Sequence, residues 1–236
     1  MMPRVRSPHP LLRRAALGAT LAVVFTQAAA VAAHAATLTT DARCYLQGAP
    51  LRMTATGLVP QAPLTVALDG QTLRYRNGAT PTADAAGGFA SSFAVPALLP
   101  GVEQKRHVLA VSDGASRPRA RFTVTRPTGA DFEPSSGSPR TLRARFSVWG
   151  FALGGGASDA RVWLHWVAPN GSVRASAALG AAGGDCGALT TAPRRVFPFV
   201  AIPGRWVLVF DTQRRYRTQA SGPRAKIAVH VRSLSL

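Results

Sequence analysis

Apolar and polar side chains alternate along short segments of the chain from residue 36 onward, and glycine, proline, asparagine and aspartate separate the segments. A period of two is the pattern of a β-strand with one buried face, whereas a helix repeats every three to four residues. Near the C-terminus, Ile227, Val229 and Val231 alternate with Ala228 and His230. The pattern predicts an all-β protein whose strands each keep one apolar face.

The clearest alternating segments fall into two groups. The predicted strands are 51–56, 63–68, 88–95, 106–112 and 119–125 in the first group, and 142–149, 161–167, 172–178, 206–210 and 225–234 in the second. Asp69-Gly70 separates two polar-apolar segments of the first group and predicts a tight hairpin turn, since glycine accepts the positive φ that such turns require.

A stretch rich in proline, glycine and serine separates the two groups. We therefore predict a β-sandwich over 36–126, a linker over 127–139 and a second β-sandwich over 140–236. The segment 179–203 is longer than an ordinary hairpin loop, and we expect it to carry a functional or docking surface.

The N-terminal residues have the pattern of an export signal. Several arginines precede an alanine-rich apolar run that ends in Ala33-His34-Ala35. Small residues at this spacing suit a signal peptidase, which predicts a signal peptide over 1–35 that is cleaved after Ala35. Thr20 and Gln27 interrupt the run and disfavour a retained membrane anchor. The mature chain is predicted to be secreted or envelope-associated and to lack a transmembrane segment, with the general and twin-arginine export routes both open.

The chain is strongly basic. Its 28 basic and 10 acidic residues give a net charge of +18, and because four arginines lie in the signal, the remainder carries +14. The expected partner is anionic: an envelope polymer, a phospholipid surface or another protein, with nucleic acid less favoured. Only Lys105 and Lys226 are lysines. A GC-rich genome explains that choice of arginine, but it does not explain the scarcity of acids.

Two cysteines, Cys44 and Cys186, follow the predicted signal. In an exported protein such a pair most simply forms a disulfide, and this one would join the two domains. Two free thiols, and a catalytic Cys186 assisted by a histidine such as His165, are the alternatives.

Motifs of the common enzyme and metal-binding classes are missing from the sequence. Asp159, Asp185 and Asp211 are scattered among turns without metal-ligand spacing, and no nucleophile elbow, zinc-binding helix or phosphate-binding glycine loop occurs. His165 lies between Trp163 and Trp166 and is expected to be a half-buried sheet residue rather than a base. We therefore predict a protein that is not an enzyme and that holds neither a cofactor nor a metal.

The best candidates for contacts with an anionic partner are arginines of the second domain. The predicted basic patch consists of Arg194, Arg195, Arg214, Arg215 and Arg217. A merely solvated face is the alternative. Trp163, Trp166 and Tyr216 could form an aromatic platform for a ligand, although core packing is the simpler use of tryptophan. Residues 127–236 carry fourteen basic and five acidic residues, against ten and five for 36–126.

Several short motifs carry a resemblance to known families. The stretches Ala55–Pro60, Leu64–Gly70, Ala83–Phe89, Arg106–Val111 and Ala120–Val124 resemble bacterial immunoglobulin-like domains of exported proteins, over about residues 50 to 125. The stretches Trp163–Gly171, Gly184–Gly187, Phe197–Phe199 and Gly204–Thr212 are similar to the second half of exported two-domain proteins of unassigned function from high-GC bacteria. The resemblance implies two immunoglobulin-like sandwiches and supplies no activity or site residue.

Together these observations predict an exported, non-enzymatic protein of the binding or adhesion type, in the cell envelope or the extracellular space. It would consist of two β-sandwich (immunoglobulin-like) domains after a cleaved signal peptide. A structural spacer without its own ligand is the alternative, and an envelope hydrolase that uses Cys186 and His165 is less favoured.

Overall fold

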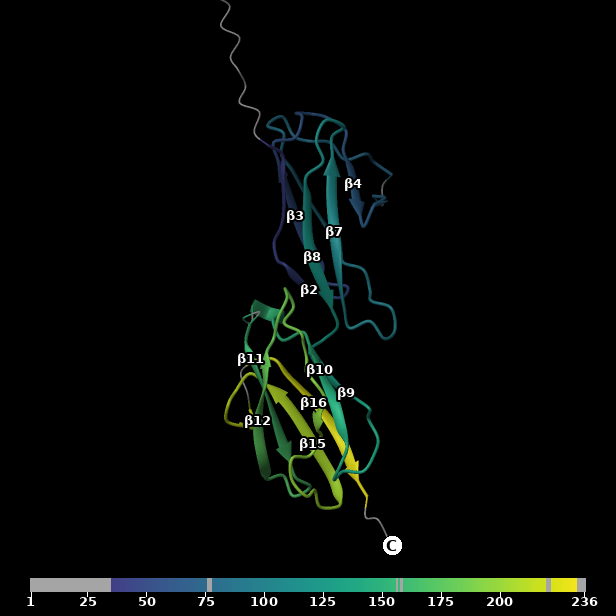
Figure 1. The fold of residues 1–236 in the computed structure, drawn as a ribbon. Coiled ribbons are helices and arrows are strands. Elements are labelled where there is room, and N and C mark those ends of the chain that lie inside the picture. Colours follow the sequence, from purple (N-terminus) through teal and green to yellow (C-terminus); the bar gives the residue numbers. More distant parts are fainter. Residues whose placement is uncertain (1–34, 76–77, 156, 158, 220–221, 233–236) are drawn as a thin grey trace, which may run out of the picture. The chain divides into compact units, whose positions relative to one another are not determined.

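The computed structural model of the protein describes residues 35–75, 78–155, 157, 159–219 and 222–232 (Figure 1). Apart from Ala35, the predicted signal peptide lies outside these residues, as does the end of the last predicted strand. The described regular structure consists of β-strands and one short 3-10 turn, Leu153–Gly155. The all-β prediction is confirmed.

The first sandwich pairs a three-stranded sheet with a five-stranded one. The first sheet has the order β1 (Thr37–Thr40), β3 (Pro50–Thr56) and β6 (Phe89–Ala94). The second has the order β2 (Cys44–Leu46), β8 (Arg119–Thr125), β7 (Gln104–Ser112), β4 (Thr65–Leu68) and β5 (Gln71–Thr72). The β2–β8 pairing is parallel and the others are antiparallel. The chain therefore changes sheets between β1 and β2.

The core of the first sandwich follows from the alternation of side chains. Leu51, Met53 and Ala55 point inward from β3 and are at most 1% exposed, and Phe122 and Val124 of β8 are fully buried. Removal of each large side chain from water contributes about 1.5–3 kcal/mol, which offsets the entropy lost on folding.

The second sandwich also has two sheets. In one, β10 (Arg143–Trp149) pairs with β9 (Gly129–Glu133), β13 (Leu189–Thr190) and β14 (Arg194–Arg195). The other has the order β12 (Val173–Ala181), β11 (Arg161–Val167), β15 (Gly204–Asp211) and β16 (Arg224–Val231). Phe146, Leu164, Leu208 and Phe210 are fully buried between the sheets. Each sandwich therefore has its own hydrophobic core.

Both sandwiches have the strand order of immunoglobulin-type domains. In each, a sheet of the A, B and E strands faces a sheet of the G, F, C and C′ strands; β3 and β10 are the B strands, and β7 and β15 are the F strands. A tryptophan of the C strand, buried against the opposite sheet, is typical of such domains, and Trp166 on β11 is 3% exposed. The predicted immunoglobulin-like fold is confirmed.

The connection between the sandwiches is shorter than the linker expected over 127–139. Strand β8 ends at Thr125 and β9 begins at Gly129, and β9 pairs with β10 along its whole length. Of the five residues of β9 only Phe132 is buried, so the strand has no alternating pattern to reveal it. Residues 134–139 belong to the second sandwich, where they form a largely exposed loop between β9 and β10.

A disulfide joins the two sandwiches, as predicted. It links Cys44 on β2 to Cys186, in the turn between β12 and β13, with 5.0 Å between the Cα atoms. Gly187, next in the turn, has φ +64°, and a Cβ there would lie 2.7 Å from the backbone nitrogen of Ala152. Only glycine fits this approach. Beside the disulfide, Thr123 Oγ1 donates to Asp185 Oδ2 at 3.1 Å.

Candidate functional site

A buried polar network lies on the outer face of the β12–β11–β15–β16 sheet. Because Leu164 and Trp166 face the core, His165 points to the opposite side of β11, yet it is fully buried. Its Nε2 lies 3.0 Å from the carbonyl oxygen of Gln213 and 3.1 Å from Asp211 Oδ1, and its Nδ1 lies 2.7 Å from Ser176 Oγ. Both Nε2 partners are acceptors, so Nε2 carries the proton.

Asp211 and Arg224 complete this network. Asp211 is 1% exposed, and its Oδ2 accepts a hydrogen bond from Arg224 Nη2 at 2.8 Å. Asp211 Oδ1 also accepts from the backbone N–H of Gln213 at 2.8 Å. Arg224 further donates to the carbonyl oxygens of Arg217 at 2.6 Å and Thr218 at 2.9 Å. The network thereby holds residues 213, 217 and 218 of the segment that follows β15.

Tyr216 closes the loop over the network. Its ring meets the ring of His165 edge-on with 5.6 Å between centroids, and the guanidinium of Arg224 lies 5.5 Å from the tyrosine centroid. This cover explains why His165 is fully rather than half buried. The network restrains residues 213–218 of the loop, although Gln213 Oε1 and Arg224 Nε are buried without a hydrogen-bond partner among the described residues.

The fixed loop presents three of the predicted arginines. Arg214, Arg215 and Arg217 are all exposed. The guanidinium of Arg214 lies 6.0 Å from the ring centroid of half-buried Trp163. The side chains of Arg215 and Arg217 make no hydrogen bond or ion pair within the part of the chain that the structure describes. Their positive charges are therefore free for a partner.

The other two predicted arginines lie on the facing sheet. Arg194 and Arg195 form β14, which pairs with β10. Arg195 is exposed, whereas Arg194 is half-buried and its Nη1 donates to the carbonyl oxygen of Ala178 at 3.2 Å. Ala178 is the cross-strand partner of Trp163, the residue under Arg214. Two of the five arginines thus lie on a short strand of one sheet, and the other three lie after β15 of the other sheet.

The predicted aromatic platform does not form as a unit. Trp166 is 3% exposed, its Nε1 donates to the carbonyl oxygen of Val196 at 2.7 Å, and its ring packs edge-on against Phe199. Trp166 is a core residue and cannot stack on a ligand, because its side chain, like that of Leu164, points from β11 toward the other sheet of the sandwich. Trp163 and Tyr216, both half-buried, already contact Arg214 and Arg224.

The chemistry of the hydrolase alternative is missing at its two named residues. The sulfur of Cys186 is bonded to Cys44, so it offers no thiolate. His165 exposes no ring atom to solvent. Among the described residues, no three His, Cys, Asp or Glu side chains gather as metal ligands. No helix in the same residues is long and apolar enough to cross a membrane.

A second basic surface was not predicted. A groove of about 720 Å³ is lined by residues of the first sandwich and by Asp185; its arginines are Arg43, Arg106, Arg119 and Arg121. The alternation of Arg119 and Arg121 with Ala120 and Phe122 could have placed both arginines on one face of β8. No sequence signal could have added Arg43 or Arg106.

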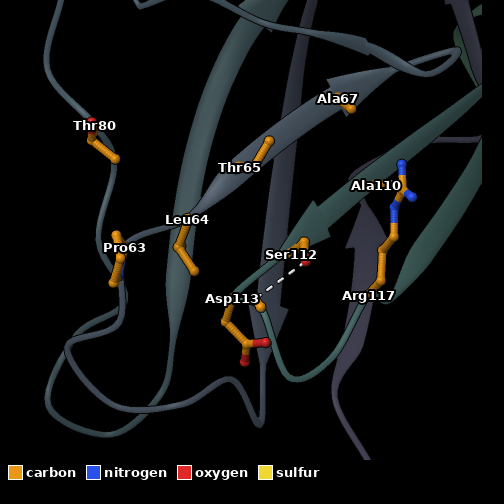
Figure 2. Close-up of a pocket in the computed structure, with 10 residues that line it drawn as sticks. Pro63, Leu64, Thr65, Ala67, Thr80, Ala110, Ser112, Asp113 and Arg117 are labelled. Carbon is orange, nitrogen blue, oxygen red and sulfur yellow. Dashed lines mark hydrogen bonds between the residues drawn. The ribbon is translucent and has the colours of Figure 1, made fainter.

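Another pocket of about 480 Å³ lies on the outer face of β4 and β7 (Figure 2). Asp113 on its wall accepts hydrogen bonds from the backbone N–H groups of Val59, Ala115 and Ser116. Burial acts to raise the pKa of this carboxyl group, but these hydrogen bonds lower it to about 2. Figure 2 shows the carboxylate and the guanidinium of Arg117 pointing in different directions. We assign Asp113 a structural role in its turn.

Comparisons with known proteins add little to this picture. No family model matches the chain, and no curated protein matches its sequence. Among solved structures, the D1–D2 segment of Rst is similar at 12% identity and a TM-score of 0.33, covering 83% of this chain and 99% of that one. Bovine butyrophilin has 7% identity and a TM-score of 0.31, covering 84% and 99%. Escherichia coli α2-macroglobulin activated by porcine elastase has 13% identity and a TM-score of 0.31, covering 83% and 20%. The fold assignment rests on the strand pairing described above.

Proposed function

We propose that the protein is a non-enzymatic binding protein of the cell envelope or extracellular space, and that it holds an anionic polymer through the loop between β15 and β16. One observation carries the proposal: the loop that exposes Arg214, Arg215 and Arg217 is fixed from below by the buried His165–Asp211 network. Because residues 213–218 are already held by hydrogen bonds in the free protein, they lose little conformational entropy on binding, which favours affinity.

Charge and compartment support the same function. The second domain has nine more basic than acidic residues, so it attracts anions before contact. A disulfide that buries Cys186 is typical of proteins outside the cytoplasm. Guanidinium groups pair with phosphate or carboxylate oxygens in a bidentate geometry, which an anionic polymer offers repeatedly.

A rigid spacer without its own ligand is the second candidate. The Cys44–Cys186 disulfide and the three-residue connection from Arg126 to Thr128 both restrain the two sandwiches, as a spacer requires. The spacer hypothesis predicts that exchange of the loop arginines has no effect beyond the loss of net charge.

The test compares two triple variants with the same net charge on a phosphocellulose column. In the first, Arg214, Arg215 and Arg217 are changed to Ser; in the control, exposed Arg52, Arg140 and Arg145 are changed to Ser. We expect the loop variant alone to elute at markedly lower salt. Loss of three phosphate contacts lowers the slope of log affinity against log salt by about 2. Equal elution of the two variants would refute the loop and favour the spacer.

A further inference from the structure

The outer face of β7 and β8 in the first sandwich carries a row of arginines. Arg119 and Arg121 are two residues apart on β8, and opposite them on β7 stand Ala110 and Val108. Arg106 lies further along β7, opposite Thr123. Because a strand rises about 3.3 Å per residue, guanidinium groups recur every ~7 Å along this face. The row suits a ligand with repeated negative charges.

These arginines line a groove rather than a flat surface. Arg43, which precedes β2, adds a fourth guanidinium. Thr39 and Thr40 of β1 also line the groove, but their hydroxyl groups already donate to the carbonyl oxygens of Thr54 and Ala42. All four arginines are exposed, and none of their side chains makes a hydrogen bond or an ion pair among the described residues. Asp185 is the single acid in the lining. Four unpaired cations around about 720 Å³ form a strong local attraction for an anion.

Backbone donors add to this attraction. Strand β2 pairs only with Thr123–Thr125 of β8. The part of β8 before Thr123 is therefore paired with β7 on one side and with no described strand on the other. The N–H of Thr123 points to the β2 side, where it donates to the carbonyl oxygen of Arg43. Strand alternation directs the N–H groups of Arg119 and Arg121 to the same side. An open strand edge therefore borders the groove.

We propose that this groove binds a linear polyol-phosphate chain, in which phosphodiester groups alternate with hydroxyl-bearing units. Each arginine can hold a phosphate through two N–H groups, and the spacing of the row lets one chain engage several phosphates. Asp185 is the reason for proposing a ligand that carries hydroxyl groups as well as phosphates. Its Oδ2 accepts from Thr123 Oγ1, while its Oδ1 is left to accept hydrogen bonds from ligand hydroxyl groups. A chain of phosphates alone would instead meet a repelling carboxylate.

The lining disfavours two other anionic partners. It contains no aromatic side chain, so the groove offers no surface on which a base can stack. It also contains none of the exposed large apolar side chains that could enter a bilayer; Leu38 is buried and Val108 is half-buried. Nucleic acid and lipid surfaces therefore become outcomes of the test.

This groove is distinct from the loop that carries Arg214. The groove proposal rests on the proposed function in one respect, because both assume that the partner is an anionic polymer. The experiment uses the protein with its disulfide intact and measures binding of poly(glycerol phosphate) by titration calorimetry. The variant R119Q/R121Q is compared with R52Q/R145Q, a control of equal charge on other exposed strand faces. We expect at least tenfold weaker binding and a salt slope smaller by about 1.5–2 for R119Q/R121Q, and less than a twofold change for the control.

A second variant tests the role of the carboxylate. With D185N, binding of poly(glycerol phosphate) should weaken while binding of inorganic polyphosphate, which lacks hydroxyl groups, should strengthen. Changes in the same direction for both probes would refute the hydroxyl requirement. Unchanged affinity of R119Q/R121Q, with a native circular-dichroism spectrum, would refute the groove itself.

Two further probes decide between ligand classes. Tighter binding of a single-stranded oligonucleotide, or of vesicles of anionic phospholipid, than of poly(glycerol phosphate) at equal phosphate would overturn the polyol-phosphate assignment. The variant that changes Arg214, Arg215 and Arg217 to Ser is measured in parallel. If it binds normally while R119Q/R121Q does not, the groove stands and the loop proposal fails; the reverse result overturns the groove.

Discussion

Asp211 is the residue on which the fixed loop depends most. Its carboxylate, 1% exposed, accepts hydrogen bonds from Arg224, His165 and the backbone N–H of Gln213. The change Asp211→Asn keeps the shape of the side chain but leaves the guanidinium of Arg224, 13% exposed, without its counter-charge. We expect the loop to lose its attachment.

The size of the effect follows from the burial of the pair. Removal of one partner of a buried ion pair costs about 3–5 kcal/mol, and because Arg224 keeps its bonds to two carbonyl oxygens we expect about 3 kcal/mol. With a urea m-value of about 1.5 kcal/mol/M, the unfolding midpoint falls by about 2 M. Urea unfolding followed by tryptophan fluorescence measures this shift, since Trp163, Trp166 and Trp206 lie in the same sandwich.

Retention on phosphocellulose distinguishes loss of the loop's attachment from a simple effect of net charge. Asp211→Asn makes the protein more positive, so net charge alone predicts stronger retention on phosphocellulose. If the loop must be fixed to bind, retention weakens and trypsin cleaves faster after Arg214, Arg215 and Arg217. Glu133→Gln changes charge equally on the exposed face of β9 and serves as the control. A free energy of unfolding within about 0.5 kcal/mol of the parent protein, with retention equal to that of Glu133→Gln, would refute the reasoning.

Two further predictions concern stability. Replacement of Cys44 and Cys186 by Ser should lower stability by about 5 kcal/mol on the chain-entropy estimate for a sequence separation of 142. Thermal unfolding with and without reductant measures this loss, and a variant as stable as the oxidised protein would contradict it. Because hydrogen bonds outweigh burial and lower the pKa of Asp113 from 3.8 to about 2, its contribution is complete above pH 4 and disappears as the pH falls through about 2. The shift corresponds to about 2 kcal/mol, which solvent screening of this half-exposed group reduces to about 1. Acid titration of unfolding should show a smaller loss below pH 4 for Asp113→Asn than for the parent protein.

The long strands could be predicted because their two faces differ. The predicted strands 119–125 and 161–167 coincide with β8 (Arg119–Thr125) and β11 (Arg161–Val167), where buried and exposed side chains alternate for at least part of the strand. The short strands β1, β2, β5, β13 and β14 have two to four residues each and were not predicted. They are held by hydrogen bonds to a longer neighbour, which leave no periodic pattern in the sequence.

The candidate sites were only partly accessible from the sequence. Clustering of Arg214, Arg215 and Arg217 predicted a basic loop, and these residues are exposed as expected. The support beneath the loop was not predicted, because His165 and Asp211 are 46 residues apart and meet only through the pairing of β11 with β15. Alternation along β11 argues against a platform that uses both Trp163 and Trp166, since the two point to opposite faces.

The sequence by itself determined the class of fold, the two groups of strands, the excess of arginine and the presence of a single cysteine pair, because these are properties of composition and of side-chain direction along one strand. Only the tertiary structure decided which charges share a surface. Arg43 reaches the arginines of β8 because β2 pairs with β8 in parallel, and Asp185 joins them because the disulfide holds its turn against Thr123. Such contacts between distant segments result from core packing and sheet register, which side-chain alternation along one strand does not encode.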